Sequence, residues 1–275
     1  MKNLYKISAS LLLTALFLSF LSAAIPVSAT KTPQTQFVNT SKELSEHILH
    51  SVARREAYIS IAVPNTLPEA KMKGTDLLRQ ILRQDSGYNR WSHQGGNVKK
   101  TTKSDHVVFE YSLTYRSTRE QDEIARNLAA ELVAAWDTKN LSDREKIGLI
   151  KAYISANWRY DDTLAGITAY STMTQKRGTC LGMTMATQLL LDEMGIQSQT
   201  IHGTILQTGV LHIRLLVKLG NLWYTLDPTH LALKNPSLFV YLKQEHGKDF
   251  LPDAEYLTDS FRHSYPMTLA DLHAA

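Results

Sequence analysis

The chain has 275 residues, a formal net charge of +4 and a single cysteine, Cys180. That length fits one domain, or a small domain followed by a larger one. The near balance of charge argues against a nucleic-acid partner, and a lone cysteine excludes an internal disulfide.

The first 29 residues are typical of an export signal. Lys2 and Lys6 form a positive start, and residues 11–21 form an apolar stretch. That stretch is shorter than the roughly 20 residues that cross a bilayer. Val27 and Ala29 occupy the two positions that a signal peptidase reads, so we predict cleavage after Ala29. The mature protein would be secreted or held at the cell surface without a membrane-spanning segment; an uncleaved anchor is the alternative.

Two predicted segments follow the signal. Residues 30–39 are rich in Thr, Pro, Gln and Asn, which predicts a flexible leader. Residues 40–137 are predicted to form an α+β region in which no motif indicates chemistry. Within it, residues 106–115 alternate apolar and polar side chains, as a half-buried strand does. The other elements expected there are a helix from Thr40, a strand over 58–63, a helix over 75–84, a loop over 85–104 and a helix over 120–136.

Residues 138–275 are predicted to form the larger domain. Ser142 and Glu145 make a capping box that opens a helix ending near Trp158. Helices precede antiparallel strands along the chain, which is the order of α+β folds rather than of alternating βαβ units. The other elements expected here are a loop over 161–178, a helix over 180–194, and strands over 198–206, 210–218 and 222–226.

Cys180 is predicted to be a nucleophile, with an inert core thiol as the alternative. It opens a helix and follows Lys176 and Arg177 closely. A helix N-terminus presents unpaired N–H groups and a partial positive charge, which stabilise a thiolate. An exported protein normally pairs or avoids its cysteines, so a lone thiol indicates a retained function.

A thiolate nucleophile needs a base and an orienting partner, and His212 and Asp227 are the candidates. Both fall on a predicted hairpin. If the turn lies at residues 219–220, the two stand directly opposite each other. If it lies at residues 220–221, Asp227 stands opposite Arg214 and diagonal to His212, on the same face. Either register brings a carboxylate to the imidazole.

Two other histidines, His202 and His230, lie nearby in the sequence. None of these histidines shows the short helical spacing of a metal site, and no cysteine pair exists. We therefore expect no metal and no cofactor. The chain also lacks a G-x-S-x-G elbow, which argues against a serine hydrolase.

Residues 142–230 resemble the transglutaminase-like superfamily, in particular its exported bacterial members. Each motif is short, but their order and spacing together are specific. The motifs that carry the resemblance are Tyr160-Asp161, Gly178-Thr179-Cys180-Leu181-Gly182, Val210-Leu211-His212 and Leu222-Trp223-Tyr224-Thr225-Leu226-Asp227-Pro228-Thr229.

This resemblance implies a papain-like core, in which the helix that begins with Cys180 packs on an antiparallel sheet carrying His212 and Asp227. It also implies that Cys180 attacks a carboxamide or peptide carbonyl. His212 would activate the thiol, Asp227 would orient His212, and the backbone N–H of Cys180 would stabilise the oxyanion. The resulting thioester would pass to an amine or to water.

The sequence departs from the family pattern beside the base. Ile213 and Arg214 follow His212, where family members carry a small or aromatic residue and then a polar one. Arg214 could bind a substrate carboxylate, compete for Asp227 or form a surface ion pair. Tyr170 could be a second oxyanion or pocket residue, or a packing residue.

These observations together predict an exported thiol-dependent enzyme that transfers the acyl group of a carboxamide or peptide bond. Its partner would be a protein or peptide, and the mildly basic composition suits an anionic cell envelope as the setting. One alternative is a cysteine peptidase acting on proteins or cell-wall peptides. The other is a non-catalytic binding module that retains the fold.

Overall fold

The computed structural model describes residues 34–85, 87–163, 166–232, 240–241 and 250–267. The predicted export signal and the first residues of the predicted leader lie outside these ranges. All the described residues fall in one compact unit that begins at Pro33. The boundary predicted between residues 137 and 138 therefore stays a prediction.

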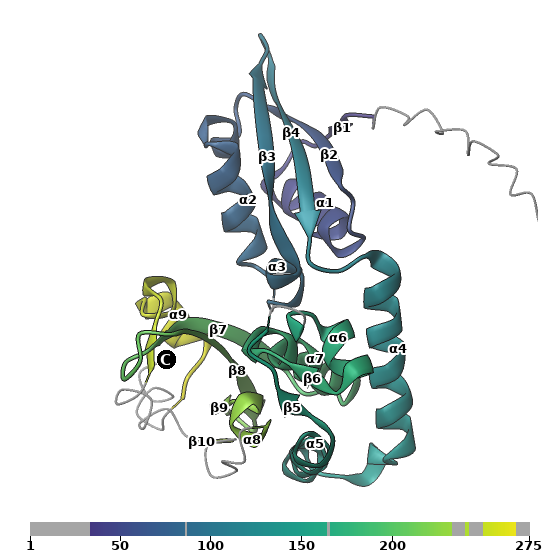
Figure 1. Cartoon of the computed structure of the whole chain (residues 1–275). Coiled ribbons are helices and arrows are strands. Elements are labelled where there is room, and N and C mark those ends of the chain that lie inside the picture. The colour runs from purple at the N-terminus through teal and green to yellow at the C-terminus, as the bar shows by residue number, and fades with distance from the viewer. Residues whose placement is uncertain (1–33, 86, 164–165, 233–239, 242–249, 268–275) are drawn as a thin grey trace, which may run out of the picture. The chain divides into compact units, whose positions relative to one another are not determined.

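A four-stranded sheet with two helices on one face organises residues 36–115 (Figure 1). The elements are β1 (Gln36–Phe37), α1 (Ser41–Ala53), β2 (Tyr58–Pro64), a 3-10 turn (Pro68–Lys71), α2 (Gly74–Leu82), α3 (Tyr88–Ser92), β3 (His93–Thr102) and β4 (His106–Tyr115). The strand order is β1-β2-β4-β3, with β1 parallel to β2 and the other pairs antiparallel.

The alternation predicted for residues 106–115 is confirmed in β4. Its apolar side chains lie in the core against the buried faces of α1 and α2. Side chains at i, i+4 and i+8 of α1 (Leu44, Ile48 and Val52) are all buried, which gives that helix one apolar stripe.

Two predictions for this region differ from the structure. The loop predicted over 85–104 contains α3 and β3, and β3 pairs with β4 along its whole length. Polar residues and two glycines hid the strand, because as an edge strand β3 has partly exposed faces and an irregularity between His93 and Gly95. The ordered chain also begins before residue 40, because Gln36 and Phe37 pair with β2 and Val38 is buried.

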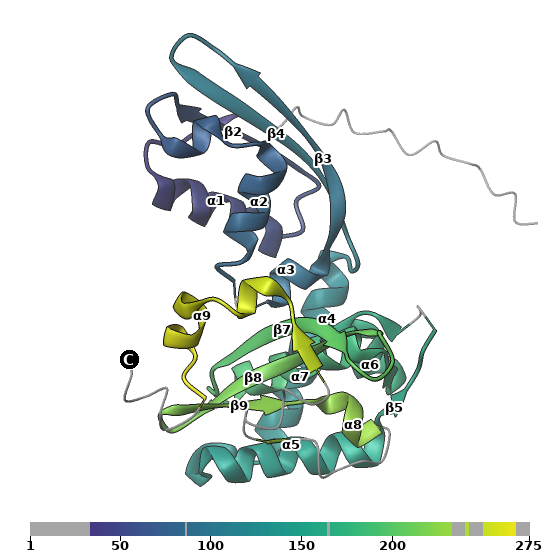
Figure 2. The same cartoon turned by 90° about the vertical axis from the view of Figure 1, so that its left-hand side faces the viewer.

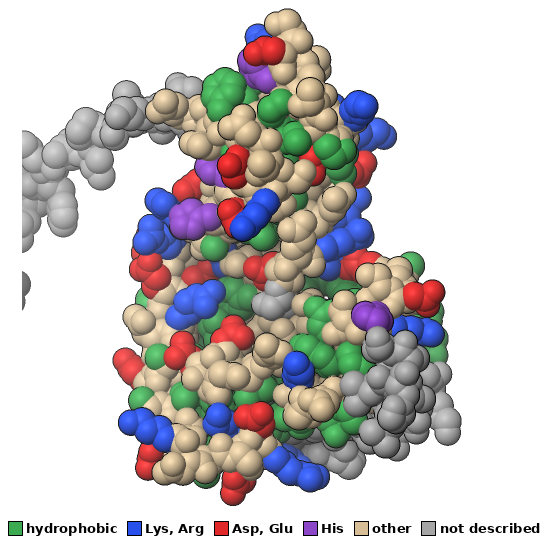
Figure 3. Space-filling view, turned by 180° about the vertical axis from the view of Figure 1, so that it is seen from behind, with side chains coloured by type: hydrophobic (Ala, Val, Ile, Leu, Met, Phe, Trp, Pro, Cys, Tyr) green, Lys and Arg blue, Asp and Glu red, His purple; other side chains and the backbone are tan. Residues whose placement is uncertain are grey.

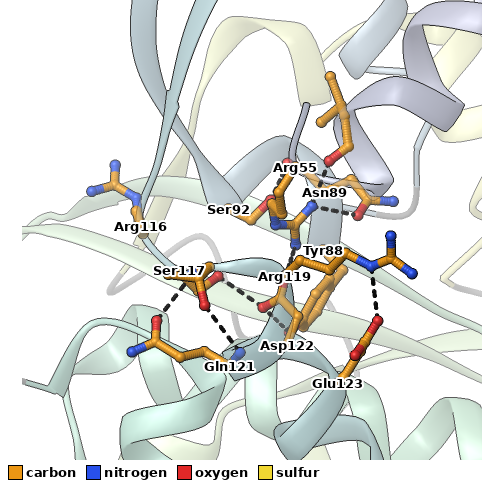
Figure 4. A network of polar contacts seen from close by, with 12 residues as sticks. Arg55, Tyr88, Asn89, Ser92, Arg116, Ser117, Arg119, Gln121, Asp122 and Glu123 are labelled. Atoms are coloured by element: carbon orange, nitrogen blue, oxygen red, sulfur yellow. Dashed lines mark hydrogen bonds and ion pairs between the residues drawn. The ribbon is translucent and has the colours of Figure 1, made fainter. Parts of the chain in front are cut away.

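A buried carboxylate fixes the turn from β4 into α4 (Arg119–Ala135), the helix predicted over 120–136. Asp122 Oδ1 accepts hydrogen bonds from Tyr88 Oη at 3.1 Å and Ser117 Oγ at 2.8 Å. Arg55 pairs with the same carboxylate and also donates to Asn89 at 3.3 Å (Figure 4). The network ties α1, α3 and α4 together at one point.

The rest of the chain is an antiparallel sheet with helices packed on it (Figure 2). Its strands are β7 (Ser198–Ile205), β8 (Leu211–Leu219), β9 (Leu222–Leu226), β10 (Val240–Tyr241) and β11 (Phe250–Pro252), in the order β10-β9-β8-β7-β11. A separate parallel pair joins β5 (Arg159–Tyr160) to β6 (Arg177–Gly178). The helical elements are a 3-10 turn (Thr138–Asn140), α5 (Asp143–Asn157), α6 (Ala169–Gln175), α7 (Cys180–Glu193), α8 (Pro228–Ala232), a 3-10 turn (Ala254–Tyr256) and α9 (Asp259–Ser264).

Helix α7 is the centre of this second part. Every residue from Gly182 to Leu191 is buried, and the helix contacts α4, α6 and β8. A helix that is buried on all sides is a core helix. The predicted α+β class, with a papain-like packing of the Cys180 helix on an antiparallel sheet, is confirmed.

The loop predicted over 161–178 contains α6. Thr168 and Ser171 cap this helix reciprocally, and its Ala169 and Met173 side chains are buried against the core. The cap uses Ser at the third helical position rather than the usual Glu or Gln, so the sequence pattern does not show it.

No helix among the described residues is long and apolar enough to cross a membrane. On the face seen from behind, basic and acidic side chains are interspersed rather than gathered by sign (Figure 3).

Candidate active site

Cys180 is the first residue of α7, as predicted. Thr179 is the N-cap, and its Oγ1 accepts a hydrogen bond from Gly182 N at 3.4 Å. A Cβ at Gly182 would meet the backbone oxygen of Gly166 at 2.1 Å, so only glycine allows the preceding loop to lie this close to the helix. The thiol is half-buried at the positive end of a core helix.

The β8–β9 hairpin has the second of the two registers considered. Leu219 pairs with Leu222, which places the turn at Gly220 and Asn221. Gly220 takes the left-handed φ of +61° that such a turn requires. Asp227 directly follows β9, so its carboxylate reaches the diagonal neighbour His212: Nε2 lies 2.7 Å from Oδ2.

Cys180 lies close enough to His212 to raise the pKa of the imidazole. Because Nε2 faces the carboxylate of Asp227, Nδ1 is the ring nitrogen left for the thiol. Burial alone would lower the pKa of His212, but the hydrogen bond to Asp227, the proximity of Cys180 and the negative charges of both raise it to about 9. The structure thus brings His212 into hydrogen-bond contact with Asp227 and into electrostatic reach of Cys180, and the raised pKa favours a protonated imidazole at neutral pH.

Asp227 is fully buried and surrounded by donors. Thr229 N donates to Oδ1 at 3.0 Å, and Oδ2 lies 2.8 Å from Arg214 Nε and 3.5 Å from His230 Nε2. Burial would raise the pKa of Asp227, but the His212 hydrogen bond and the neighbouring cations hold it below its usual range. The carboxylate therefore stays ionised in the core.

Arg214 lies in the protein core, beside Asp227. Its side chain is 0% exposed, pairs with Asp227 and lies over the Phe250 ring, 4.4 Å from the centroid. A guanidinium without exposed surface can neither receive a substrate carboxylate nor form a surface ion pair. Of the three roles considered, only the interaction with Asp227 matches this position, because β8 is buried on both faces.

Tyr170 lies in α6, where its partly buried ring packs against the core cluster around α7. This position agrees with the packing role.

Tyr160 is a residue near the thiol to which the sequence assigned no role. It pairs with Gly178, two residues before Cys180, and the residue is 37% exposed. Burial raises the pKa of Tyr160, and the charges of Cys180, Asp162 and Asp227 add to the effect. The signal that could have found it was the Tyr160-Asp161 motif itself.

The other histidines take structural positions. His202 Nδ1 lies 2.8 Å from Asp253 Oδ2, and its ring lies against Trp91 with centroids 5.1 Å apart. Among the described residues, no group of His, Cys, Asp and Glu side chains has the geometry of a metal site.

Comparison with known proteins identifies a family for the central part of the chain. Residues 126–228 match the model of the Transglutaminase-like superfamily. No curated protein is significantly similar to the sequence. Among solved structures, a TGase shares 14% identity over 71% of this chain (TM-score 0.36), and calcium-bound LapG of Legionella pneumophila shares 15% over 58% (TM-score 0.36). The chain spans 59% of the TGase chain and 90% of the LapG chain.

Proposed function

We propose that this chain is a thiol-dependent acyl transferase or amide hydrolase, because residues 126–228 match the model of the Transglutaminase-like superfamily. The superfamily is typically enzymatic. In the proposed enzyme Cys180 is the nucleophile, His212 the acid and base, and Asp227 the orienting carboxylate. The observation that carries the proposal is the 2.7 Å contact between His212 Nε2 and Asp227 Oδ2, with Cys180 close enough to raise the pKa of the same imidazole.

In the first half-reaction the Cys180 thiolate attacks the carbonyl carbon of a carboxamide. The oxyanion forms next to the backbone N–H of Cys180, the first residue of α7, which has no acceptor within the helix. His212, protonated at neutral pH because its pKa is about 9, gives its proton to the departing nitrogen. The C–N bond breaks, ammonia or an amine leaves, and a thioester to Cys180 remains.

In the second half-reaction His212, now neutral, takes a proton from an incoming amine or water. That nucleophile attacks the thioester carbon, and the C–S bond breaks. The Cys180 thiolate and the His212 imidazolium are restored as a pair. An amine completes transfer, and water completes hydrolysis.

Arg214 acts in this scheme through Asp227 as a positioning residue. Both side chains are fully buried, and their 2.8 Å contact fixes the carboxylate and supports its negative charge. An ionised, immobile Asp227 in turn keeps Nε2 of His212 protonated and Nδ1 directed at the thiol.

The substrate class proposed is a protein or peptide met outside the cytoplasm. The proposal of export rests on the two lysines, the apolar stretch and the small residues of the first 29 positions. A cell-envelope substrate fits the mildly basic composition. Fractionation of cells expressing the full chain, and a variant without those 29 residues, tests the location.

A glutamine-rich protein and a fluorescent primary amine test the chemistry. Transfer attaches the amine to the protein, hydrolysis releases ammonia without attachment, and peptidase activity shortens the chain. Cys180→Ser is expected to abolish whichever product forms, while Ser198, buried in β7, serves as a control through Ser198→Ala. A product that persists in the Cys180→Ser variant would contradict the proposed nucleophile.

A further inference from the structure

One cavity among the described residues lies away from the triad. It encloses about 410 Å³ and is formed by α2, α3, the first half of β3 and the face of β4. Figure 2 shows α2 running beside the β3–β4 hairpin, and the two elements are in contact. The apolar side chains that line it are Leu78, Leu82, Trp91, Val98, Tyr111 and Leu113.

The cavity exists because two consecutive residues of β3, Gly95 and Gly96, have no side chain to fill the space between the sheet and α2. Gly96 stands opposite Leu113 in the ladder, and Gly95 precedes it. Leu78 and Leu82 of α2 form the opposite wall. The space between helix and strand is therefore a groove with an apolar floor, bounded on one side by the start of β3.

β3 is the edge strand of its sheet, and the groove lies along the half of β3 that carries no charged side chain. Lys99 and Lys100 lie on the far half, where charged side chains protect an edge from unwanted pairing. Residues 94–98, which line the groove, carry no charge. Among the residues that the structure describes, no strand pairs with the outer edge of β3. An unpaired strand edge beside a helix-walled groove is the arrangement by which extended peptides add to a sheet.

The charged side chains that line the groove are all basic. They are Arg79, Arg90 and Arg116, with His93 beside them and no Asp or Glu in the lining. Arg79 pairs with Asp76, and Arg90 pairs with Glu255.

Arg116 differs from these two arginines. Its Nε donates to Trp91 O at 3.0 Å, and no ion pair joins it to a carboxylate among the residues that the structure describes. In Figure 4 its guanidinium points away from the Asp122 network, which the next residue, Ser117, joins. His93 Nε2 is also buried without a hydrogen-bond partner in the described part of the chain. Arg116 is thus a cation of the groove lining that no acidic side chain of the lining neutralises.

We propose that this groove binds an extended, acidic segment of a partner protein. The segment pairs through its backbone with the free edge of β3 at residues 94–98. It places an apolar side chain between Leu82 and Leu113 and an aspartate or glutamate against Arg116. The proposal is independent of the chemistry at Cys180.

Selection of a random peptide library displayed on phage, with the full chain as bait, tests the proposal. The expected peptides combine apolar residues with Asp or Glu. The strongest is then synthesised with a dye and titrated by fluorescence anisotropy. Arg116→Gln is expected to weaken it at least tenfold, while Arg144→Gln, an exposed arginine of α5 outside the groove, leaves its affinity unchanged.

Two changes to the peptide keep the test independent of how the variants fold. Replacing the Asp or Glu of the peptide by Asn or Gln removes the charge that meets Arg116 and is expected to lower the affinity by the same factor of ten. Methylating alternate backbone nitrogens blocks strand addition and is expected to abolish binding. The proposal is overturned if selection enriches no acidic peptide, or if Arg116→Gln, the amide peptide and the methylated peptide all bind as tightly as the originals.

Discussion

Replacing Arg214 by methionine removes a cation that supports Asp227 in the core. Both side chains are 0% exposed, and the contact is 2.8 Å. Breaking a buried ion pair from one side costs about 3–5 kcal/mol, because the remaining charge stays buried without its partner. Asp227 keeps its hydrogen bonds to His212 and to Thr229 N, so we expect the lower end, about 3 kcal/mol.

This loss corresponds to a melting temperature lower by about 6–12 °C, at 2–4 °C per kcal/mol for a domain of this size. Thermal unfolding followed by circular dichroism at pH 7 measures it. Arg144→Gln is the matched control, since Arg144 is exposed and a surface substitution changes stability by about 0.5 kcal/mol or less.

The pH dependence of this loss identifies its cause. Neighbouring cations, including Arg214, depress the pKa of Asp227 in the folded state. The stability that this provides is present above the unfolded value of about 3.9 and is lost as the pH falls through the folded value. The difference in the free energy of unfolding between wild type and Arg214→Met should therefore become smaller as the pH is lowered. The reasoning is refuted if the stability lost in Arg214→Met is the same at pH 7 and well below the unfolded value of about 3.9, or if the loss at pH 7 is below about 1 kcal/mol.

Three further predictions separate effects on stability from effects on catalysis. Gly182→Ala is expected to lower the free energy of unfolding by about 1–3 kcal/mol, because the new Cβ would lie 2.1 Å from a backbone oxygen. Gly148→Ala in α5, where a Cβ meets nothing within 4 Å, is expected to raise it by about 0.5–1 kcal/mol; equal melting temperatures of the two variants would contradict this. Tyr160→Ala removes the ring beside the thiol and is expected to lower kcat/KM about tenfold at an unchanged melting temperature; unchanged kinetics would exclude Tyr160 from the site. Turnover is expected to fall as the pH rises through about 9, where His212 loses the proton that it gives to the leaving nitrogen. His212 contributes fully to the stability of the fold below the pKa of histidine in the unfolded chain, and this contribution is lost as the pH rises through about 9. A rate that keeps rising well beyond pH 9 would count against His212 as the acid.

The hairpin shows how far the sequence could predict this site. Side chains alternate between the two faces of a strand, and this alone put Asp227 on the same face as His212 in either register. The contact between the two side chains was therefore predictable. The choice between registers depended on the turn, and Gly220 with its positive φ selects one. The alternation was reliable here because a one-residue slip would have moved every side chain of the strand to the other face.

Other features were hidden because their signals depend on tertiary context. β8 is buried on both faces, so its pattern could not tell a core arginine at position 214 from a surface one. β3 has mostly polar residues and two glycines, and only its pairing with β4 makes it a strand. The position of Tyr160 beside Cys180 follows from the β5–β6 pair, whose two-residue strands no local pattern reveals.

The rate at which iodoacetamide labels Cys180 tests the proposed thiolate–imidazolium pair most directly. Wild type and His212→Gln are compared from about pH 5 to pH 10, and the labelled peptide is quantified by mass spectrometry. We expect wild type to react at least ten times faster near pH 6, with the difference closing above about pH 8.5, where free thiols ionise unaided. Equal rates near pH 6, in variants that melt at the same temperature, would contradict the assignment of His212 as the partner of Cys180.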